Sequence, residues 1–142
     1  MFQFEIQQIK GTRVLASLTY LTSVLDLGMS LLNLAKKNLT SFNPKDEAQK
    51  IITQIAHEIG LSRAFLFGSG ATSQFNAESD LDIILIFSDD VDLRAVQKKI
   101  YSKRWSEWPI DFIIKSESDF EKRKIAGGVC YEASLYGIEM KP

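Results

Sequence analysis

Apolar residues repeat with helical spacing in the N-terminal segment from Thr12 to Lys37. They recur every three or four positions, at Val14, Leu18, Leu21, Leu25, Met29 and Leu32. A second line widens this stripe, at Val24, Leu27, Leu31 and Leu34. Polar residues interrupt the segment too often for a membrane span, which needs about 20 consecutive apolar residues. The wide stripe instead predicts a helix that packs against a large surface, either this chain's own core or a second subunit in a homodimer.

A second helix is predicted to begin at Pro44. Asn43 is a favourable N-cap residue, Pro44 suits the first helical position, and acidic residues follow in the first turn. Gly60 favours the end of this helix. His57, the only histidine, stands near that end and is interpreted as a structural or solvent-facing residue. The apolar face of the helix consists of Ala48, Ile51, Ile52, Ile55, Ala56 and Ile59.

Three short apolar runs, at 64–67, 81–87 and 110–114, predict buried strands. Between them, a short helical turn and loop fit residues 71–79, and a helix is predicted over 91–103. A mainly helical pattern follows over 118–136, interrupted by two glycines. The predicted fold class is α/β: a small mixed β-sheet with packed helices and an extra N-terminal helix. The predicted division is a helical extension at 1–42 and a domain at 43–142.

Composition limits the classes of function. The chain has 142 residues, of which 45% are hydrophobic and 25% charged, as in an ordinary globular domain. The net charge of -1 gives no global attraction for nucleic acid or an anionic membrane, so neither is expected as a partner. Cys130 is the only cysteine, which excludes an internal disulfide, and it is interpreted as a small core thiol. Without a visible secretory signal, the predicted location is the cytoplasm.

A basic cluster surrounds the helix predicted over 91–103. It consists of Arg94, Lys98, Lys99, Lys103 and Arg104, and Trp105 and Trp108 follow it. Contact with nucleic acid or a triphosphate is one interpretation of such a cluster. The favoured interpretation is a solvated helix face, with basic residues near the helix C-terminus and the tryptophans packed beside the third strand.

The candidate chemistry begins where the first apolar strand ends, at Gly68-Ser69. Glycine lets the backbone approach a bulky anion closely, and the amides of such a turn suit phosphate oxygens. Ten residues later, Ser79-Asp80-Leu81-Asp82 opens the second strand. Carboxylates two positions apart on a strand point to the same face, so Asp80 and Asp82 are expected to lie side by side.

A third carboxylate, Asp111, lies in the apolar third strand. If that strand lies beside the second, Asp111 joins Asp80 and Asp82. Like charges held together prefer a cation, and a hard divalent ion such as Mg²⁺ can also bridge to phosphate oxygens. Three carboxylates can hold two such ions, an arrangement suited to in-line displacement at phosphorus. Asp111 can also accept the proton of an attacking hydroxyl.

This arrangement resembles the minimal nucleotidyltransferases of the DNA polymerase beta superfamily. Their pattern is an apolar strand, Gly-Ser, about ten residues, Asp-x-Asp, and a third carboxylate on a later strand. Here it reads Leu66-Phe67-Gly68-Ser69, then Ser79-Asp80-Leu81-Asp82, then Asp111. The ending from Glu132 to Gly137 also resembles the family's usual close. The resemblance covers roughly Ala48 to Ile138.

The resemblance implies transfer of a nucleoside monophosphate, usually AMP from ATP, to a hydroxyl acceptor with Mg²⁺ as cofactor. By position, Gly68, Ser69 and Ser79 would bind the nucleotide. Asp80, Asp82 and Asp111 would bind two metal ions and form the catalytic site. Many small family members are antitoxins paired with a helical HEPN-type ribonuclease toxin, and some adenylylate a toxin tyrosine. A HEPN-type protein is therefore a candidate partner.

Two features depart from the family pattern. After Gly-Ser the family often has a basic or aromatic residue, then Ala, then Arg-Gly, whereas this chain has Gly70-Ala71-Thr72-Ser73. The N-terminal helix is the second departure. Together they motivate an alternative, an antitoxin-like binding module that neutralises its partner by contact with weak catalysis. A further alternative is nucleotidyl transfer to a small molecule or an RNA end.

Overall fold

The computed structural model describes residues 23–33 and 42–142. Contacts divide the chain into two units, residues 1–41 and 42–142, and each is described by itself. In the first unit, residues 23–33 form a helix, as the apolar spacing predicts. The rest of the predicted N-terminal helix, with Val14, Leu18, Leu21 and Leu34, lies outside the described residues. None of the described helices is both long and apolar enough to cross a membrane.

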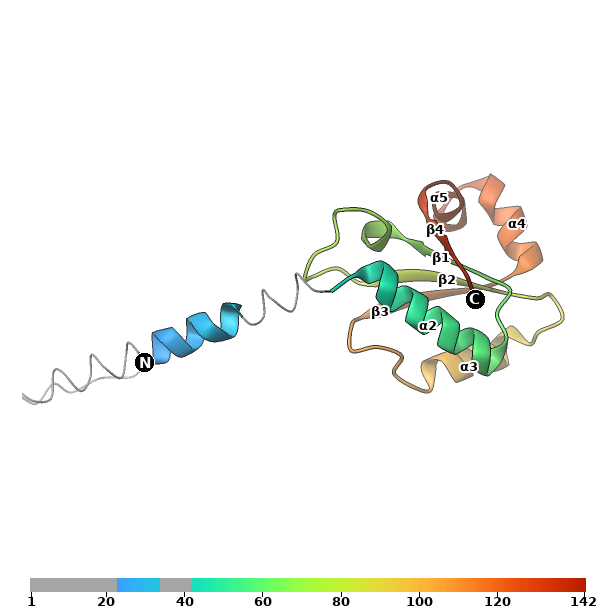
Figure 1. Cartoon of the computed structure of the whole chain (residues 1–142). Helices are drawn as coiled ribbons and strands as arrows, with labels where there is room; N and C mark the ends of the chain where they lie inside the picture. Colours follow the sequence, from blue (N-terminus) through green and yellow to red (C-terminus); the bar gives the residue numbers. More distant parts are fainter. Residues whose placement is uncertain (1–22, 34–41) are drawn as a thin grey trace, which may run out of the picture. The chain divides into compact units, whose positions relative to one another are not determined.

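The second unit is built on a four-stranded mixed sheet (Figure 1). Its strands are β1 (Arg63–Phe67), β2 (Leu81–Phe87), β3 (Ile110–Ser116) and β4 (Ile138–Met140), in the order β3-β2-β1-β4. β2 and β3 run parallel, whereas β1 pairs antiparallel with both β2 and β4. The predicted α/β class with a small mixed sheet is confirmed.

Helices cover both faces of this sheet (Figure 1). α2 (Pro44–Ile59) and α3 (Leu93–Tyr101) pack on one face, and α4 (Glu117–Ala126) and α5 (Val129–Tyr136) on the other. α2 begins as predicted, because the Asn43 side chain accepts a hydrogen bond from the Lys45 amide at 3.0 Å and Pro44 opens the helix. α4 and α5 are separate helices because Gly127 and Gly128 adopt positive φ angles between them.

The alternation of side chains along β2 divides the core in two. Leu81, Ile83 and Leu85 face the α2 and α3 layer, whereas Ile84 and Ile86 face the α4 and α5 layer. The predicted apolar face of α2 belongs to the first core, with Ile51, Ile52 and Ile55 fully buried. Cys130 belongs to the second, as predicted, and burial raises the pKa of its thiol.

Several boundaries differ from the sequence predictions. The helical turn predicted in the loop at 71–79 lies earlier, as the 3₁₀ helix η1 (Gly68–Ala71), because the chain turns at Gly68 immediately after β1. The third strand extends to Ser116, and the helix predicted over 91–103 is shorter. Asp92 caps α3 by accepting hydrogen bonds from the amides of residues 94 and 95, which fixes its start. β4 was not predicted, because three residues carry too little periodicity.

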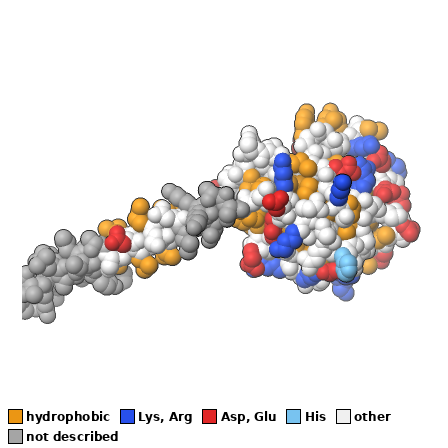
Figure 2. Space-filling model, viewed as in Figure 1, with side chains coloured by type: hydrophobic (Ala, Val, Ile, Leu, Met, Phe, Trp, Pro, Cys, Tyr) orange, Lys and Arg blue, Asp and Glu red, His pale blue; other side chains and the backbone are white. Residues whose placement is uncertain are grey.

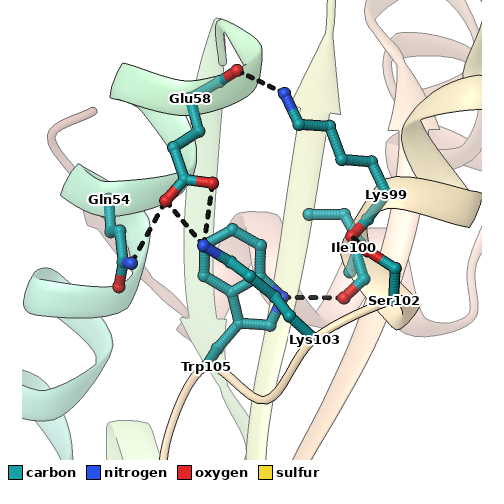
Figure 3. A network of polar contacts seen from close by, with 7 residues as sticks. All are labelled: Gln54, Glu58, Lys99, Ile100, Ser102, Lys103 and Trp105. Atoms are coloured by element: carbon teal, nitrogen blue, oxygen red, sulfur yellow. Dashed lines mark hydrogen bonds and ion pairs between the residues drawn. The ribbon is translucent and has the colours of Figure 1, made fainter.

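Part of the basic cluster ties α3 and the following loop to α2 (Figure 3). Lys103 Nζ lies 2.6 and 2.8 Å from the two carboxylate oxygens of Glu58, and Lys99 donates to the Glu58 carbonyl at 2.7 Å. Lys103 also stands 3.8 Å from the ring centroid of Trp105, whose indole donates to the Ile100 carbonyl at 2.7 Å. These contacts support the structural interpretation of the cluster for Lys99 and Lys103.

Candidate active site

Strand register brings the sequence-predicted residues to one end of the sheet. Because β1 and β2 are antiparallel, Phe67 at the end of β1 pairs with Asp82 at the start of β2. Because β2 and β3 are parallel and in register, Asp82 pairs with Asp111 on the other side. Neighbouring strands lie about 5 Å apart, so the two aspartates are adjacent on one face of the sheet. The structure thus places Gly68, Asp82 and Asp111 in a row across three adjacent chain segments.

Gly68 packs directly against the Asp82 carboxylate. A Cβ added at position 68 would overlap Oδ2 of Asp82, so a side chain there would require the carboxylate to move. The backbone of Gly68 also has a φ of 63°, which L-residues with side chains rarely adopt. Both constraints explain why glycine stands at this position. The Gly-Ser turn, expected from the sequence to bind phosphate, also shapes the surroundings of a carboxylate.

The turn after Gly68 is held by its own backbone. The Ser69 carbonyl accepts hydrogen bonds from both the amide and the hydroxyl of Thr72, each at 3.1 Å. Gly70 is buried, and a Cβ there would lie 3.0 Å from Cδ1 of Leu66 and 3.7 Å from Cδ2 of Leu81. The departure from the family pattern at Gly70 therefore coincides with a position packed closely against the core. Ser69 is half-buried and follows Gly68 in the same turn.

The loop between η1 and β2 is folded on itself around Ser79. The Ser79 hydroxyl accepts a hydrogen bond from the Asn76 amide at 3.0 Å, and the Ser79 amide donates to the Asn76 carbonyl at 3.1 Å. The Asn76 side chain accepts from the Glu78 amide at 2.8 Å. The Ser79 hydroxyl oxygen thus stabilises the loop. Asp80 follows immediately and lies just before β2, which corrects the expectation that both aspartates belong to the strand.

Sequence reasoning missed a cluster of three aromatic rings that supports this loop. Phe42 stacks on Trp108 with ring centroids 4.2 Å apart, and Phe75 lies 5.6 Å from Phe42 and 5.5 Å from Trp108. Phe75 is part of the loop itself. In the sequence, Phe75 is a lone aromatic residue in an otherwise small and polar stretch. The sequence does not show which distant aromatic residues pack against it. Packing of Trp108 was anticipated, whereas its connection to the loop was not.

The three carboxylates carry like charges and have no cationic partner among residues 23–33 and 42–142. Partial burial, followed by the charges of Asp111 and Asp80, raises the pKa of Asp82. None of the three forms an ion pair or a side-chain hydrogen bond with any residue in the described part of the chain. Several acidic side chains of α2 and α4 are paired with a lysine, as Glu58 is with Lys103 and Asp119 with Lys115, whereas these three aspartates place unpaired negative charge at one end of the sheet.

The donor set fits a hard divalent cation in its chemistry. Carboxylate oxygens are the ligands that Mg²⁺ prefers, and a cation would offset both the burial and the neighbouring negative charges that raise the pKa of Asp82. Within residues 23–33 and 42–142, no three acidic, histidine or cysteine side chains are already arranged around a single point for a metal ion. Mg²⁺ usually keeps several water ligands and binds through one or two carboxylates and substrate phosphates, so it does not need such a preformed cage.

Charges of both signs are interspersed over the face of the second unit that Figure 2 shows. Lys99 and Lys103 are engaged by Glu58, and Arg104 lies 2.9 Å from a carboxylate oxygen of Glu107. Hydrophobic side chains also stand at the surface over α5 (Figure 2), among which Val129, Tyr131, Leu135 and Tyr136 are at least 41% exposed.

The chain is similar to known proteins over most of its second unit. Residues 48–129, more than half of the chain, match the model of the nucleotidyltransferase domain family. No curated protein matches the chain. Among solved structures, one described as "a putative nucleotidyltransferase from Sulfolobus solfataricus" matches with 18% identity and a TM-score of 0.46, over 66% of this chain and 76% of that one. The matched segment contains the Gly-Ser turn and all three aspartates, and the chain belongs to the nucleotidyltransferase domain family, as a minimal nucleotidyltransferase of the DNA polymerase beta superfamily.

Proposed function

We propose that this chain uses Mg²⁺ to transfer AMP from ATP to a hydroxyl group of a protein, a tyrosine of a helical HEPN-type toxin. The family supplies the general reaction, nucleotidyl transfer. The observation that carries the proposal for this chain is the in-register pair of Asp82 and Asp111, with Gly68 packed against Asp82 at the same sheet end.

Each residue has a defined task in this proposal. The backbone turn at Gly68 and the hydroxyl of Ser69 bind the triphosphate, with Ser79 as a further donor. Asp80, Asp82 and Asp111 would hold the divalent ions, and these would supply positive charge to the phosphate oxygens. Asp111 accepts the proton of the attacking hydroxyl. The acceptor oxygen forms a bond to the α-phosphorus, the bond to the β-phosphate oxygen breaks, and pyrophosphate leaves.

The experiment is transfer of label from ATP labelled at the α-phosphate, in Mg²⁺, to the product of the neighbouring gene. We expect labelling by the wild type and a loss of at least about 100-fold in Asp82→Asn and Asp111→Asn, since each replaces an anionic metal ligand by a neutral amide. Asp46→Asn is the matched control, because Asp46 is an exposed carboxylate in the first turn of α2. Equal labelling by Asp82→Asn and Asp46→Asn would sink the proposed site.

A second candidate is a binding module that neutralises its partner by contact. The observation that favours it is the loop from Gly68 to Asp80, which contains no lysine or arginine for the triphosphate. The exposed apolar side chains of α5 offer a surface for a protein partner. Under this alternative, wild type and Asp82→Asn bind and neutralise the partner equally, and neither transfers label.

A further inference from the structure

Trp108 is bonded to the backbone on one side of Asp80. Its indole Nε1 donates a hydrogen bond to the carbonyl oxygen of Ser79 at 2.7 Å. On the other side of Asp80, the Leu81 amide donates to the carbonyl of Pro109 at 2.9 Å. The two residues that flank Asp80 are therefore both held by the adjacent residues 108 and 109, which lead into β3 and Asp111.

The Trp108 ring is itself fixed from several directions. It stacks on Phe42 at 4.2 Å with an interplanar angle of 18°, and Phe75 lies against it from the loop that carries Ser79. The Trp108 amide donates to the Ser106 hydroxyl at 3.0 Å, and that hydroxyl donates to Glu47 of α2 at 2.5 Å. These contacts hold the Trp108 ring, and with it the indole N–H, in a fixed position relative to α2.

Asp80 needs such external support. It lies outside β2, and its side chain has no hydrogen bond or ion pair with the residues that the structure describes. Mutual repulsion with Asp82 favours moving it away, toward solvent. Backbone bonds on both sides oppose that movement before any cation is present.

We propose that Trp108 is a positioning residue of the carboxylate site: by fixing the Ser79 carbonyl, its indole N–H holds Asp80 beside Asp82 for a divalent cation. The inference rests on the proposed function, since it assigns a task to a residue that supports the metal ligands. Trp108 does not contact substrate in this role. It acts through the backbone of Ser79.

The chain offers a matched pair of variants. Trp105 is the other tryptophan of the chain, and its indole also donates to a backbone carbonyl at 2.7 Å, that of Ile100. Trp108→Phe and Trp105→Phe each keep an aromatic ring and remove one such hydrogen bond. Trp105 is 8% exposed and serves the end of α3, so its loss should lower stability without affecting Asp80.

The first measurement is Mn²⁺ affinity in the absence of nucleotide, from the electron paramagnetic resonance signal of the free ion, with full-length protein. We expect Trp108→Phe to weaken Mn²⁺ binding by about two- to ten-fold, the range for one lost hydrogen bond. Trp105→Phe should retain the wild-type affinity, although both variants unfold at lower temperature. Equal affinity in the two variants, whether both unchanged or both lowered, would overturn the role of Trp108.

The second measurement needs no change at Trp108. In Trp105→Phe, Trp108 is the remaining tryptophan, and Mg²⁺ bound beside Asp80 should change its fluorescence emission, because its indole is bonded to the carbonyl of the preceding residue. Adding Asp82→Asn to this variant should abolish the change. No response to Mg²⁺ in a protein that binds Mn²⁺ through Asp82 overturns this inference alone, whereas a wild type that binds no Mn²⁺ overturns the metal site of the proposed function as well.

Discussion

The backbone of Gly68 lies so close to the Asp82 carboxylate that any side chain at position 68 would overlap its Oδ2 atom. The contact follows from the register, since Phe67 pairs with Asp82 and the chain turns at the next residue. A turn suited to phosphate and a carboxylate suited to a cation are thereby joined in one packing unit. A change in either one is expected to disturb the other.

Gly68→Ala tests this coupling. The positive φ should cost roughly 1–2 kcal/mol of stability, and displacement of the Asp82 carboxylate should also weaken Mn²⁺ binding. The matched control is Gly60→Ala, because Gly60 has a φ of 80° but nothing within 4 Å of an added Cβ. Thermal unfolding and Mn²⁺ titration of both variants check the prediction. Metal affinity that is the same in the two variants would show that the contact with Asp82 has no importance for the site.

Asp82 should make the metal-free protein less stable as the pH rises. Burial and the charges of Asp111 and Asp80 raise its pKa in the folded state. The folded protein therefore holds this proton more tightly than the unfolded chain, where the pKa is about 3.9. The penalty is absent below that unfolded value, grows with pH and is complete above the raised folded pKa. Asp82→Asn should accordingly unfold at a higher temperature than the wild type at pH 7 and at an equal one near pH 3.

Asp119→Asn is the control of opposite sign for this pH series. Hydrogen bonds from Arg123 and Lys115 lower the pKa of Asp119 in the folded state, so its contribution to stability is present at pH 7 and lost as the pH falls through that lowered value. We expect a lower unfolding temperature for Asp119→Asn at pH 7, measured in a chelating buffer. The idea fails if Asp82→Asn also destabilises the metal-free protein at pH 7.

Local patterns made much of the site predictable. Asp82 and Asp111 stand in apolar strands, where burying a charge is unfavourable. The two-residue spacing of Asp80 and Asp82 predicts that their side chains point to the same face. The sequence predicted that Asp82 and Asp111 are neighbours only if their two strands are adjacent, because no sequence pattern shows which strands pair. The structure supplies that condition through the parallel register of β2 and β3.

The parts that could not be predicted depend on contacts between distant residues. Trp108 bonds to Ser79, which is 29 positions away in the sequence, and stacks on Phe42, which precedes α2. β4 becomes a strand only by pairing with β1, with Leu66 opposite Ile138. The start of α2 was predictable from the Asn43 cap. Both ends of α3 were predicted two residues too far out, although Asp92 caps its start, and Lys103, predicted to be helical, lies in the following loop and pairs with Glu58.

The Glu58 network of Figure 3 gives a stability prediction away from the site. A hydrogen bond from Lys103, the largest effect, lowers the pKa of Glu58 in the folded state. The contribution of Glu58 to stability is therefore present above its unfolded pKa and lost as the pH falls through the folded value. Glu58→Gln should lower the unfolding temperature slightly at pH 7 and not at pH 3, with Mn²⁺ affinity unchanged. A difference that persists at pH 3 would show that charge is not its cause.

The residues from Phe42 onward should fold without the preceding segment. Their buried apolar side chains, from Ala48 to Met140, form two cores that both lie within this unit. We expect the fragment 42–142 to unfold cooperatively, and to be a monomer if the N-terminal segment mediates the predicted homodimer. The matched fragment 44–142 lacks the Phe42 ring and the Asn43 cap, so it should be less stable by at least about 0.5–2 kcal/mol, the usual cost of a lost cap. Thermal unfolding and sedimentation of the two fragments and the full chain check this, and an insoluble 42–142 fragment would show that the N-terminal segment completes the core.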